Sequence, residues 1–381
     1  MLRRKQCCSR IAVPILDFKF LHWYPFMLKS TALVSCTLFV ATAVLSSMAT
    51  RASSEKTVRV YSNDLKVLSA PQPLLADHPE FVQPVIASVR YEAPQLISDS
   101  SADLSVRAWR FSYNARGVIE MPNRLQAAKT AVVVVHPWGV DDGQGWKTPQ
   151  PAGAIFACTP DKNRVMVQHG KVVVNPLLKT LRSRVGMVVY SLPGRGDPIR
   201  RKLYRSMSYK PSAAEREEAQ KQLTAKLKSF RYQGSDIPKR IELRSSKPAI
   251  DYFRQFPGLD ASARYNNQGF RDLPIPVMGS IEVAPNDVVI YDGEGYDALK
   301  RFLQHNGIEH VLMCGYHADM CVCSTTAGHE NLRRDFNVFL VGDAVQATFP
   351  ANSSAQYATN QAVSFASLNV LITQTSWIIP D

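Results

Sequence analysis

A cysteine follows a buried strand and a glycine turn in the last third of this 381-residue chain. The stretch reads His310-Val-Leu-Met-Cys-Gly-Tyr-His-Ala-Asp-Met-Cys-Val-Cys, and a second apolar strand begins at Asn337. A polar helix between the two strands would make this a βαβ unit. In α/β folds, ligands and chemistry occupy the carboxyl ends of parallel strands. If Cys321 starts the helix, the unpaired backbone N–H groups there favour its thiolate. Cys321 is therefore the first candidate nucleophile.

The other cysteines suggest less reactive roles. Cys314 lies within an apolar strand and is expected in the core. Cys321 and Cys323 are two residues apart at the start of the expected helix and would point to different faces, so a disulfide between them is not expected. Redox use of this pair remains an alternative to hydrolysis. The remaining cysteines are Cys7, Cys8, Cys36 and Cys158.

The amino terminus has the pattern of an export signal. Residues 30–45 carry no charge and are mostly apolar, Lys29 precedes them, and Ser47-Met48-Ala49 follows. This predicts a secretory signal (residues 1–49) cleaved after Ala49, or an uncleaved membrane anchor. Met27 is an alternative start. We therefore expect an exported protein, either periplasmic, extracellular or membrane-anchored.

Positive charge is concentrated in one segment. The chain has a formal net charge of +13, and residues 200–247 hold fourteen Lys or Arg against five Asp or Glu, a net charge of +9. This predicts either contact with an anionic surface or a solvated insertion. Export and the lack of a recognisable binding motif argue against nucleic acid as a partner.

Apolar runs alternate with helical patterns from residue 128 to residue 375. This alternation predicts an α/β fold, a three-layer doubly wound parallel sheet with helices on both faces. Residues 50–127 contain strand-like segments and form a β-rich extension, and residues 194–275 form a long basic insertion. Strands are expected at 57–61, 106–113, 131–135, 186–190, 287–291, 310–316 and 337–343, and helices at 175–184, 213–228, 296–306 and 353–373.

The segment Gly315-Tyr-His-Ala-Asp-Met-Cys-Val resembles the cysteine motif of the isochorismatase-like hydrolases, which include isochorismatases, nicotinamidases and related amidohydrolases. The flanking strands are also similar, and the resemblance covers about residues 128–193 and 280–375. It implies a Rossmann-like sheet and hydrolysis of a C–N bond in a small amide by Cys321. It further implies a cis peptide at His317–Ala318, which would aim backbone N–H groups near Ala318 and Cys321 at an oxyanion.

Two positions depart from the family pattern. The aspartate expected at the end of the first strand is replaced by His136, and the lysine expected after the third strand is replaced by Tyr291, with Asp292 next. Lys300 lies too far along the chain to replace that lysine. The Asp-x-His-x-x-His metal pattern of nicotinamidases is absent, so we expect no metal and no other cofactor.

These departures leave two interpretations open. In the first, His136 partners Cys321 because strands one and four are neighbours in such folds, and Asp141, Asp142 or Asp292 orients the imidazole. Tyr291 would then donate a hydrogen bond in place of the lysine.

The loop after the first strand would form the substrate pocket in this interpretation. Trp138 and Trp146 flank that loop and could stack on a planar small molecule, and Asp141, Asp142 and Asp292 are further candidates for lining the pocket.

In the second interpretation, the chain is a catalytically inactive family member that acts as an exported binding or interaction protein. The basic insertion and the β-rich extension would then be its working surfaces. The resemblance also makes a homo-oligomer possible.

Overall fold

A computed structural model describes residues 66–67, 90–112, 117–139, 142, 144, 160–230, 273–347 and 370–381. All of them belong to one compact unit, Val60–Asp381. The predicted signal, the expected strand 57–61, Asp141, Trp146 and Cys158 lie outside the described residues, as do residues 231–272 and 353–369. None of the helices in the described ranges is both long enough and apolar enough to cross a membrane.

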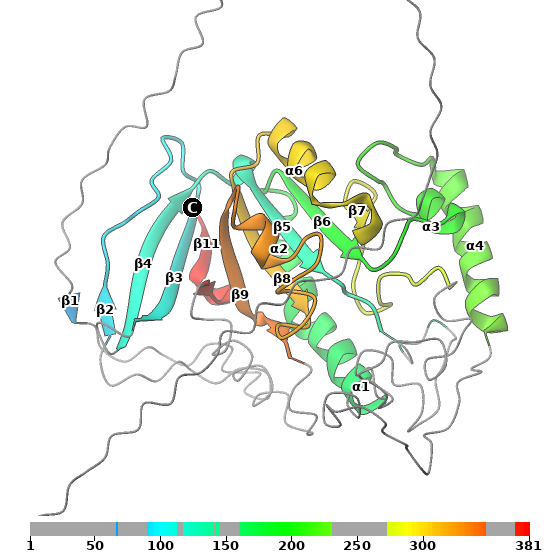
Figure 1. Cartoon of the computed structure of the whole chain (residues 1–381), viewed down its shortest axis with the longest axis horizontal. Helices are drawn as coiled ribbons and strands as arrows, with labels where there is room; N and C mark the ends of the chain where they lie inside the picture. Colours follow the sequence, from blue (N-terminus) through cyan, green and yellow to red (C-terminus); the bar gives the residue numbers. More distant parts are fainter. Residues whose placement is uncertain are drawn as a thin grey trace, which may run out of the picture. The chain divides into compact units, whose positions relative to one another are not determined.

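The described strands form one mixed sheet (Figure 1). Its order is β1-β2-β4-β3-β10-β9-β8-β5-β6-β7, with β11 pairing with β3. The strands are β1 Lys66–Val67, β2 Arg90–Glu92, β3 Leu104–Ser112, β4 Gly117–Leu125, β5 Thr130–Val135, β6 Met187–Leu192, β7 Val288–Tyr291, β8 His310–Tyr316, β9 Asn337–Gln346, β10 Leu371–Thr373 and β11 Ile378–Pro380.

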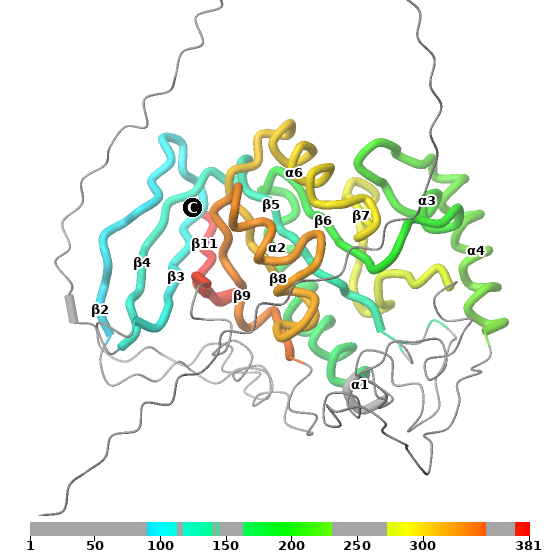
Figure 2. The backbone as a smooth tube through the Cα atoms, in the orientation of Figure 1, coloured from blue at the N-terminus to red at the C-terminus, as the bar shows by residue number. Residues whose placement is uncertain are grey.

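The strands from β10 to β7 are all parallel, and they confirm the predicted α/β fold. Every residue of β5 is buried, as its run of valines requires of a strand covered on both faces. The chain enters the parallel sheet at β5, moves outward through β6 to β7, and then returns to β8 on the other side of β5 (Figure 2). This reversal is a topological switch point, where doubly wound folds bind ligands. The ends of β5 and β8 meet there, with Val135 opposite Gly315.

The helices connect these strands. They are α1 Pro160–His169, α2 Asn175–Leu181, α3 Pro198–Leu203, α4 Ala213–Ser229, α6 Tyr296–His305 and α7 His329–Leu332, and a π-helical segment, Gly170–Val174, joins α1 to α2. With right-handed crossovers, the reversal after β7 places α6 on the face opposite α1 and α2. The helices expected at 213–228 and 296–306 are confirmed, the first of them by a capping box between Ser212 and Glu215.

Two helix predictions need correction. Asn175 does not cap a helix, because the chain is already helical from Pro160 and Asn175 itself has helical backbone angles. Its side chain instead donates to Ser280 O and accepts from Glu282 N–H. The expected helix 353–373 is wrong at its end: Leu371–Thr373 form β10, because this apolar segment fills the position between β9 and β3.

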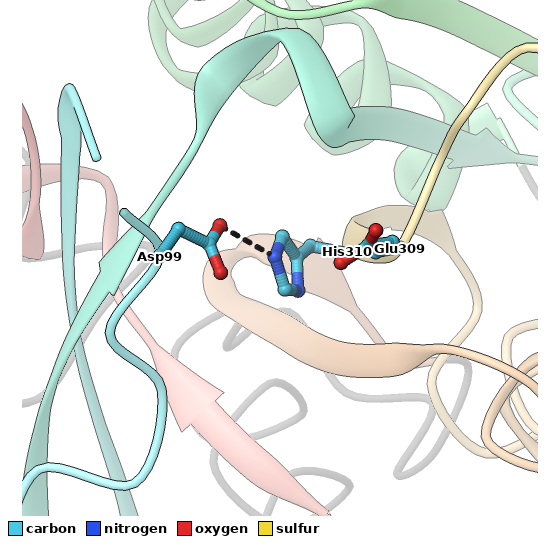
Figure 3. A group of neighbouring side chains, drawn as sticks. All are labelled: Asp99, Glu309 and His310. Carbon is cyan, nitrogen blue, oxygen red and sulfur yellow. Dashed lines mark hydrogen bonds and ion pairs between the residues drawn. The ribbon is translucent and has the colours of Figure 1, made fainter. Parts of the chain in front are cut away.

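The β-rich extension continues the same sheet. β3 and β4 form an antiparallel pair, and β3 also pairs with β10 and β11. A polar contact ties the extension to the amino end of β8: Asp99 Oδ2 lies 3.0 Å from His310 Nε2 (Figure 3).

Asp99, Glu309 and His310 have donor atoms close enough together to suggest a metal site. However, Asn337 Nδ2 lies 3.1 Å from His310 Nδ1, so Nδ1 accepts and Nε2–H donates to Asp99. The Glu309 carboxylate pairs with Lys129 at 2.8 Å. The group is therefore a structural connection, at the amino end of β8 and away from the end that leads to Cys321.

Gly315 allows β8 to approach β5 at the switch point. Its φ is 115°, and a Cβ there would lie 2.2 Å from Val135 O. We expect Gly315→Ala to lower the free energy of unfolding by about 3 kcal/mol or more, from overpacking and a strained backbone together. Urea denaturation measures this. The matched control is Gly194→Ala. The φ of Gly194 is 79°, and no atom lies within 4 Å of the position of an added Cβ. Only the backbone cost of about 1 kcal/mol should therefore appear in this variant. Equal losses at both positions would contradict the steric argument.

Candidate active site

His136 is the first residue beyond β5 and has an unusual backbone. Its φ is 44°, which is uncommon for a residue other than glycine and costs free energy that the surroundings must offset. Its N–H donates to Ser191 O at 3.0 Å, and its carbonyl accepts from Trp138 N–H at 2.8 Å. The residue is only 5% exposed. The structure therefore places a buried histidine with a strained backbone at the switch point.

The imidazole of His136 lies between an acid and a thiol. Its Nε2 lies 2.9 Å from Asp292 Oδ2, an ion-pair distance at which the two groups are not aligned for a hydrogen bond, and the Cys321 thiol is within interaction range. Burial lowers the pKa of His136, but its interactions with Asp292 and Cys321 raise the pKa more, to about 9. This pKa predicts an imidazolium at neutral pH.

Cys321 is partly exposed and has no disulfide partner. The expectation that it starts a helix is wrong. The segment after β8 runs through turns, in which the N–H groups of Met320 and Val322 both donate to His317 O, and helix α7 begins only at His329. No helix terminus therefore lies at Cys321, and His136 is the titratable group that interacts with its thiol.

The predicted cis peptide is displaced by one residue. The cis bond joins Tyr316 to His317, not His317 to Ala318. β8 extends one residue past Gly315, with Tyr316 opposite Gln346, so the irregular backbone follows Tyr316 directly. The Ala318 N–H donates to Gln346 O at 2.8 Å and is not available to an oxyanion. In the described part of the chain, Cys321 N–H donates to no backbone carbonyl, so it is the candidate oxyanion donor.

Of the predicted acids that the structure describes, Asp292 is the one that lies beside His136. It lies in a 3-10 turn after β7, and its position is fixed by Thr326, whose hydroxyl donates to Asp292 O at 2.9 Å. Thr326 N–H also donates to Asp292 Oδ1 at 3.3 Å. Sequence reasoning missed Thr326, because nothing in its local pattern distinguishes it from other turn residues.

Asp142 has a different role from the one predicted. Its carboxylate accepts from the Gln144 side chain at 2.7 Å and from Gly279 N–H at 3.2 Å. These bonds tie the loop after β5 to the segment before β7. Trp138 in the same loop is buried, at 5% exposed.

Tyr291 does not replace the missing lysine. Its side chain is 2% exposed, its ring lies under the Arg200 guanidinium at 4.6 Å, and its hydroxyl has no hydrogen-bond partner among the described residues. Burial raises the pKa of Tyr291 well above the usual value. The hydroxyl is thus a neutral group, and the ring packs against Arg200.

We expect Tyr291→Phe to leave any hydrolytic rate within about twofold of wild type and to raise the free energy of unfolding by up to about 1 kcal/mol, because it removes a buried, unpaired hydroxyl. Steady-state kinetics and urea denaturation measure the two effects. A loss of rate of more than about tenfold would restore Tyr291 as a catalytic candidate.

The other cysteines of the described chain are poor nucleophiles. Cys314 is buried in β8, as predicted, and burial raises its pKa to about 12. Burial, with the nearby Glu330 charge, also raises the pKa of Cys323, whose thiol donates to Ala318 O at 2.7 Å. Cys321 is therefore the only one of the three that has a cationic partner within the described residues.

One part of the chain is similar in sequence to a known protein family. Residues 270–375 match the model of the isochorismatase domain. No curated protein matches the chain.

Solved structures with similarity include a cysteine hydrolase from Pseudomonas syringae pv. phaseolicola (15% identity, TM-score 0.33, 66% of this chain and 91% of that chain). A nicotinamidase from Bacillus subtilis has 12% identity and a TM-score of 0.30, over 65% of this chain and 99% of that one. A protein from L. infantum in complex with nicotinate has 12% identity and a TM-score of 0.29, over 66% and 96%. These scores are low, so the assignment rests on the family-model match and on the motif around Cys321. Residues 270–375 are therefore similar to the isochorismatase domain, and this similarity includes the segment around Cys321.

Proposed function

We propose that the chain is a cysteine hydrolase that cleaves a C–N bond in a small amide. The observation that supports this is the arrangement of Cys321, His136 and Asp292 at the switch point of the sheet. The usual acid and base positions of the family have changed residue type, yet a cation still lies between a thiol and a carboxylate. Cysteine and histidine with an orienting acid form a known solution for acyl transfer.

The first step forms a thioester. The Cys321 thiolate attacks the amide carbonyl carbon, and the C=O electron pair moves to the oxygen, where the Cys321 N–H can donate to it. When the oxyanion collapses, the C–N bond breaks, and the nitrogen takes the proton from the His136 imidazolium. The amine leaves, and the acyl group remains on Cys321.

The second step releases the acid. His136, now neutral, removes a proton from water, and the hydroxide attacks the thioester carbon. The C–S bond breaks as the second oxyanion collapses, which regenerates the thiolate and leaves the imidazolium protonated. Asp292 stays charged throughout and holds the ring in place.

A screen of small primary amides, with intact-protein mass spectrometry, tests this proposal. We expect an acyl adduct on the wild-type protein and release of amine, and neither with Cys321→Ala. Ligand binding without adduct or turnover across the screen, equal in wild type and Cys321→Ala, would instead favour the inactive binding protein.

A further inference from the structure

A cavity lined by none of the three catalytic candidates lies between the basic insertion and the segment before β7. Its volume is about 270 Å³. One part of its wall is apolar, from Leu203, Val277, Ile281 and Val283. The other part includes two arginines, Arg205 after α3 and Arg216 in α4.

The two arginines are oriented but not neutralised. Arg205 Nη1 donates to Asn286 O at 2.8 Å, and Arg216 Nη1 donates to Pro211 O at 2.9 Å. A guanidinium has five N–H donors, so each keeps most of its donors. Among the described residues, no carboxylate forms an ion pair with either arginine. By contrast, Arg200 in the same insertion pairs with Asp197.

The carboxylates of two nearby acids form hydrogen bonds to groups other than the two arginines. Asp142 lies near this cavity, but its oxygens accept from Gln144 and Gly279. Glu215 on α4 accepts from the Tyr209 hydroxyl and from Ser212. The two arginines also belong to the segment that has a net charge of +9 over residues 200–247. Two guanidinium groups in the cavity wall, without a carboxylate partner in the described part of the chain, favour an anion as the ligand.

We propose that this cavity binds a small organic carboxylate. Guanidinium groups match the geometry of a carboxylate, and the apolar wall can cover a compact hydrocarbon body. The volume is just below the usual range for drug-sized ligands, which limits the ligand to a small molecule. This assignment gives part of the basic insertion a specific role, and it does not depend on the proposed hydrolysis.

Isothermal titration calorimetry of the full chain with benzoate, at low salt, tests the proposal. We expect saturable binding, weakened about tenfold or more by Arg205→Gln and by Arg216→Gln, because each removes a charge-assisted hydrogen bond. Arg216→Lys keeps the charge but loses the planar fork, so it should weaken binding to a smaller extent. Lys226→Gln, an exposed change on the same helix, is the matched control and should leave binding unchanged. Thermal melting checks that each variant is folded.

Three results would overturn the proposal. The first is no saturable heat with benzoate in the wild type. The second is an equal loss of binding in Lys226→Gln and the two glutamine variants, which would indicate diffuse attraction to the insertion. The third is binding of inorganic phosphate without binding of benzoate, which would exclude a carboxylate with an apolar body.

Discussion

Replacing His136 by glutamine is expected to slow alkylation of Cys321 by iodoacetamide at pH 7 by about 10²-fold, and to slow amide hydrolysis by about 10²- to 10⁴-fold. Glutamine keeps a polar side chain of similar size but cannot become a cation. The thiolate would lose its positive partner, and the leaving nitrogen would lose its proton donor. The rate of alkylation at Cys321, followed by peptide mass spectrometry, separates the first effect from substrate binding.

The control for this prediction is His305→Gln, an exposed histidine at the end of α6. It removes one imidazole without touching the switch point and should leave both rates unchanged. The labelling rate of Cys314, which is buried in β8, reports any general opening of the protein. If His136→Gln alkylates Cys321 as fast as wild type while Cys314 stays protected, His136 does not activate the thiol.

Replacing Asp292 by asparagine is expected to reduce hydrolysis by about 10²-fold, because the ring of His136 loses its ion pair at 2.9 Å and its fixed orientation. The pKa of His136 should also fall from about 9, since Asp292 contributes to raising it. The loss of activity at high pH, which marks deprotonation of the imidazolium, should therefore begin at a lower pH in the variant. A pH profile of hydrolysis that keeps its wild-type position in Asp292→Asn would contradict this coupling.

The interaction between His136 and Asp292 also predicts how the free energy of unfolding depends on pH. The pKa of His136 is raised from 6.5 to about 9 in the folded protein. Its contribution to the free energy of unfolding is therefore fully present below pH 6.5 and is lost as the pH rises through about 9. Urea denaturation measures the difference in free energy of unfolding between wild type and Asp292→Asn. Between pH 6.5 and about pH 9, this difference should be largest at pH 6.5 and should become smaller as the pH rises. A difference that grows from pH 6.5 to pH 9 would contradict the assigned charges.

Much of the fold could be predicted from the sequence because strand and helix patterns are local. The valine run of β5 and the apolar segment of β8 predicted buried parallel strands, and the structure places them side by side. This pairing is also why His136 could be proposed as a partner of Cys321. The strand β10 could not be predicted, because its three residues become a strand only through pairing with β9 and β3.

The site was harder to predict than the fold, since it depends on where turns place side chains. Three aspartates were candidates for orienting His136, and the sequence offered no means of choosing among them. Asp292 is selected by the turn after β7, which Thr326 holds from across the site. Asp142 is engaged elsewhere by Gln144 and Gly279. Contacts such as the bond from Thr326 join residues far apart in the chain and leave no local signal.

The most direct test of the catalytic arrangement is the charge of His136 itself. NMR spectroscopy of protein with labelled histidine, titrated across neutral and alkaline pH and assigned with His136→Gln, measures it. We predict that His136 is an imidazolium at pH 7 and loses its proton near pH 9. A neutral His136 ring at pH 7 would contradict the ion pair and, with it, the proposed activation of Cys321.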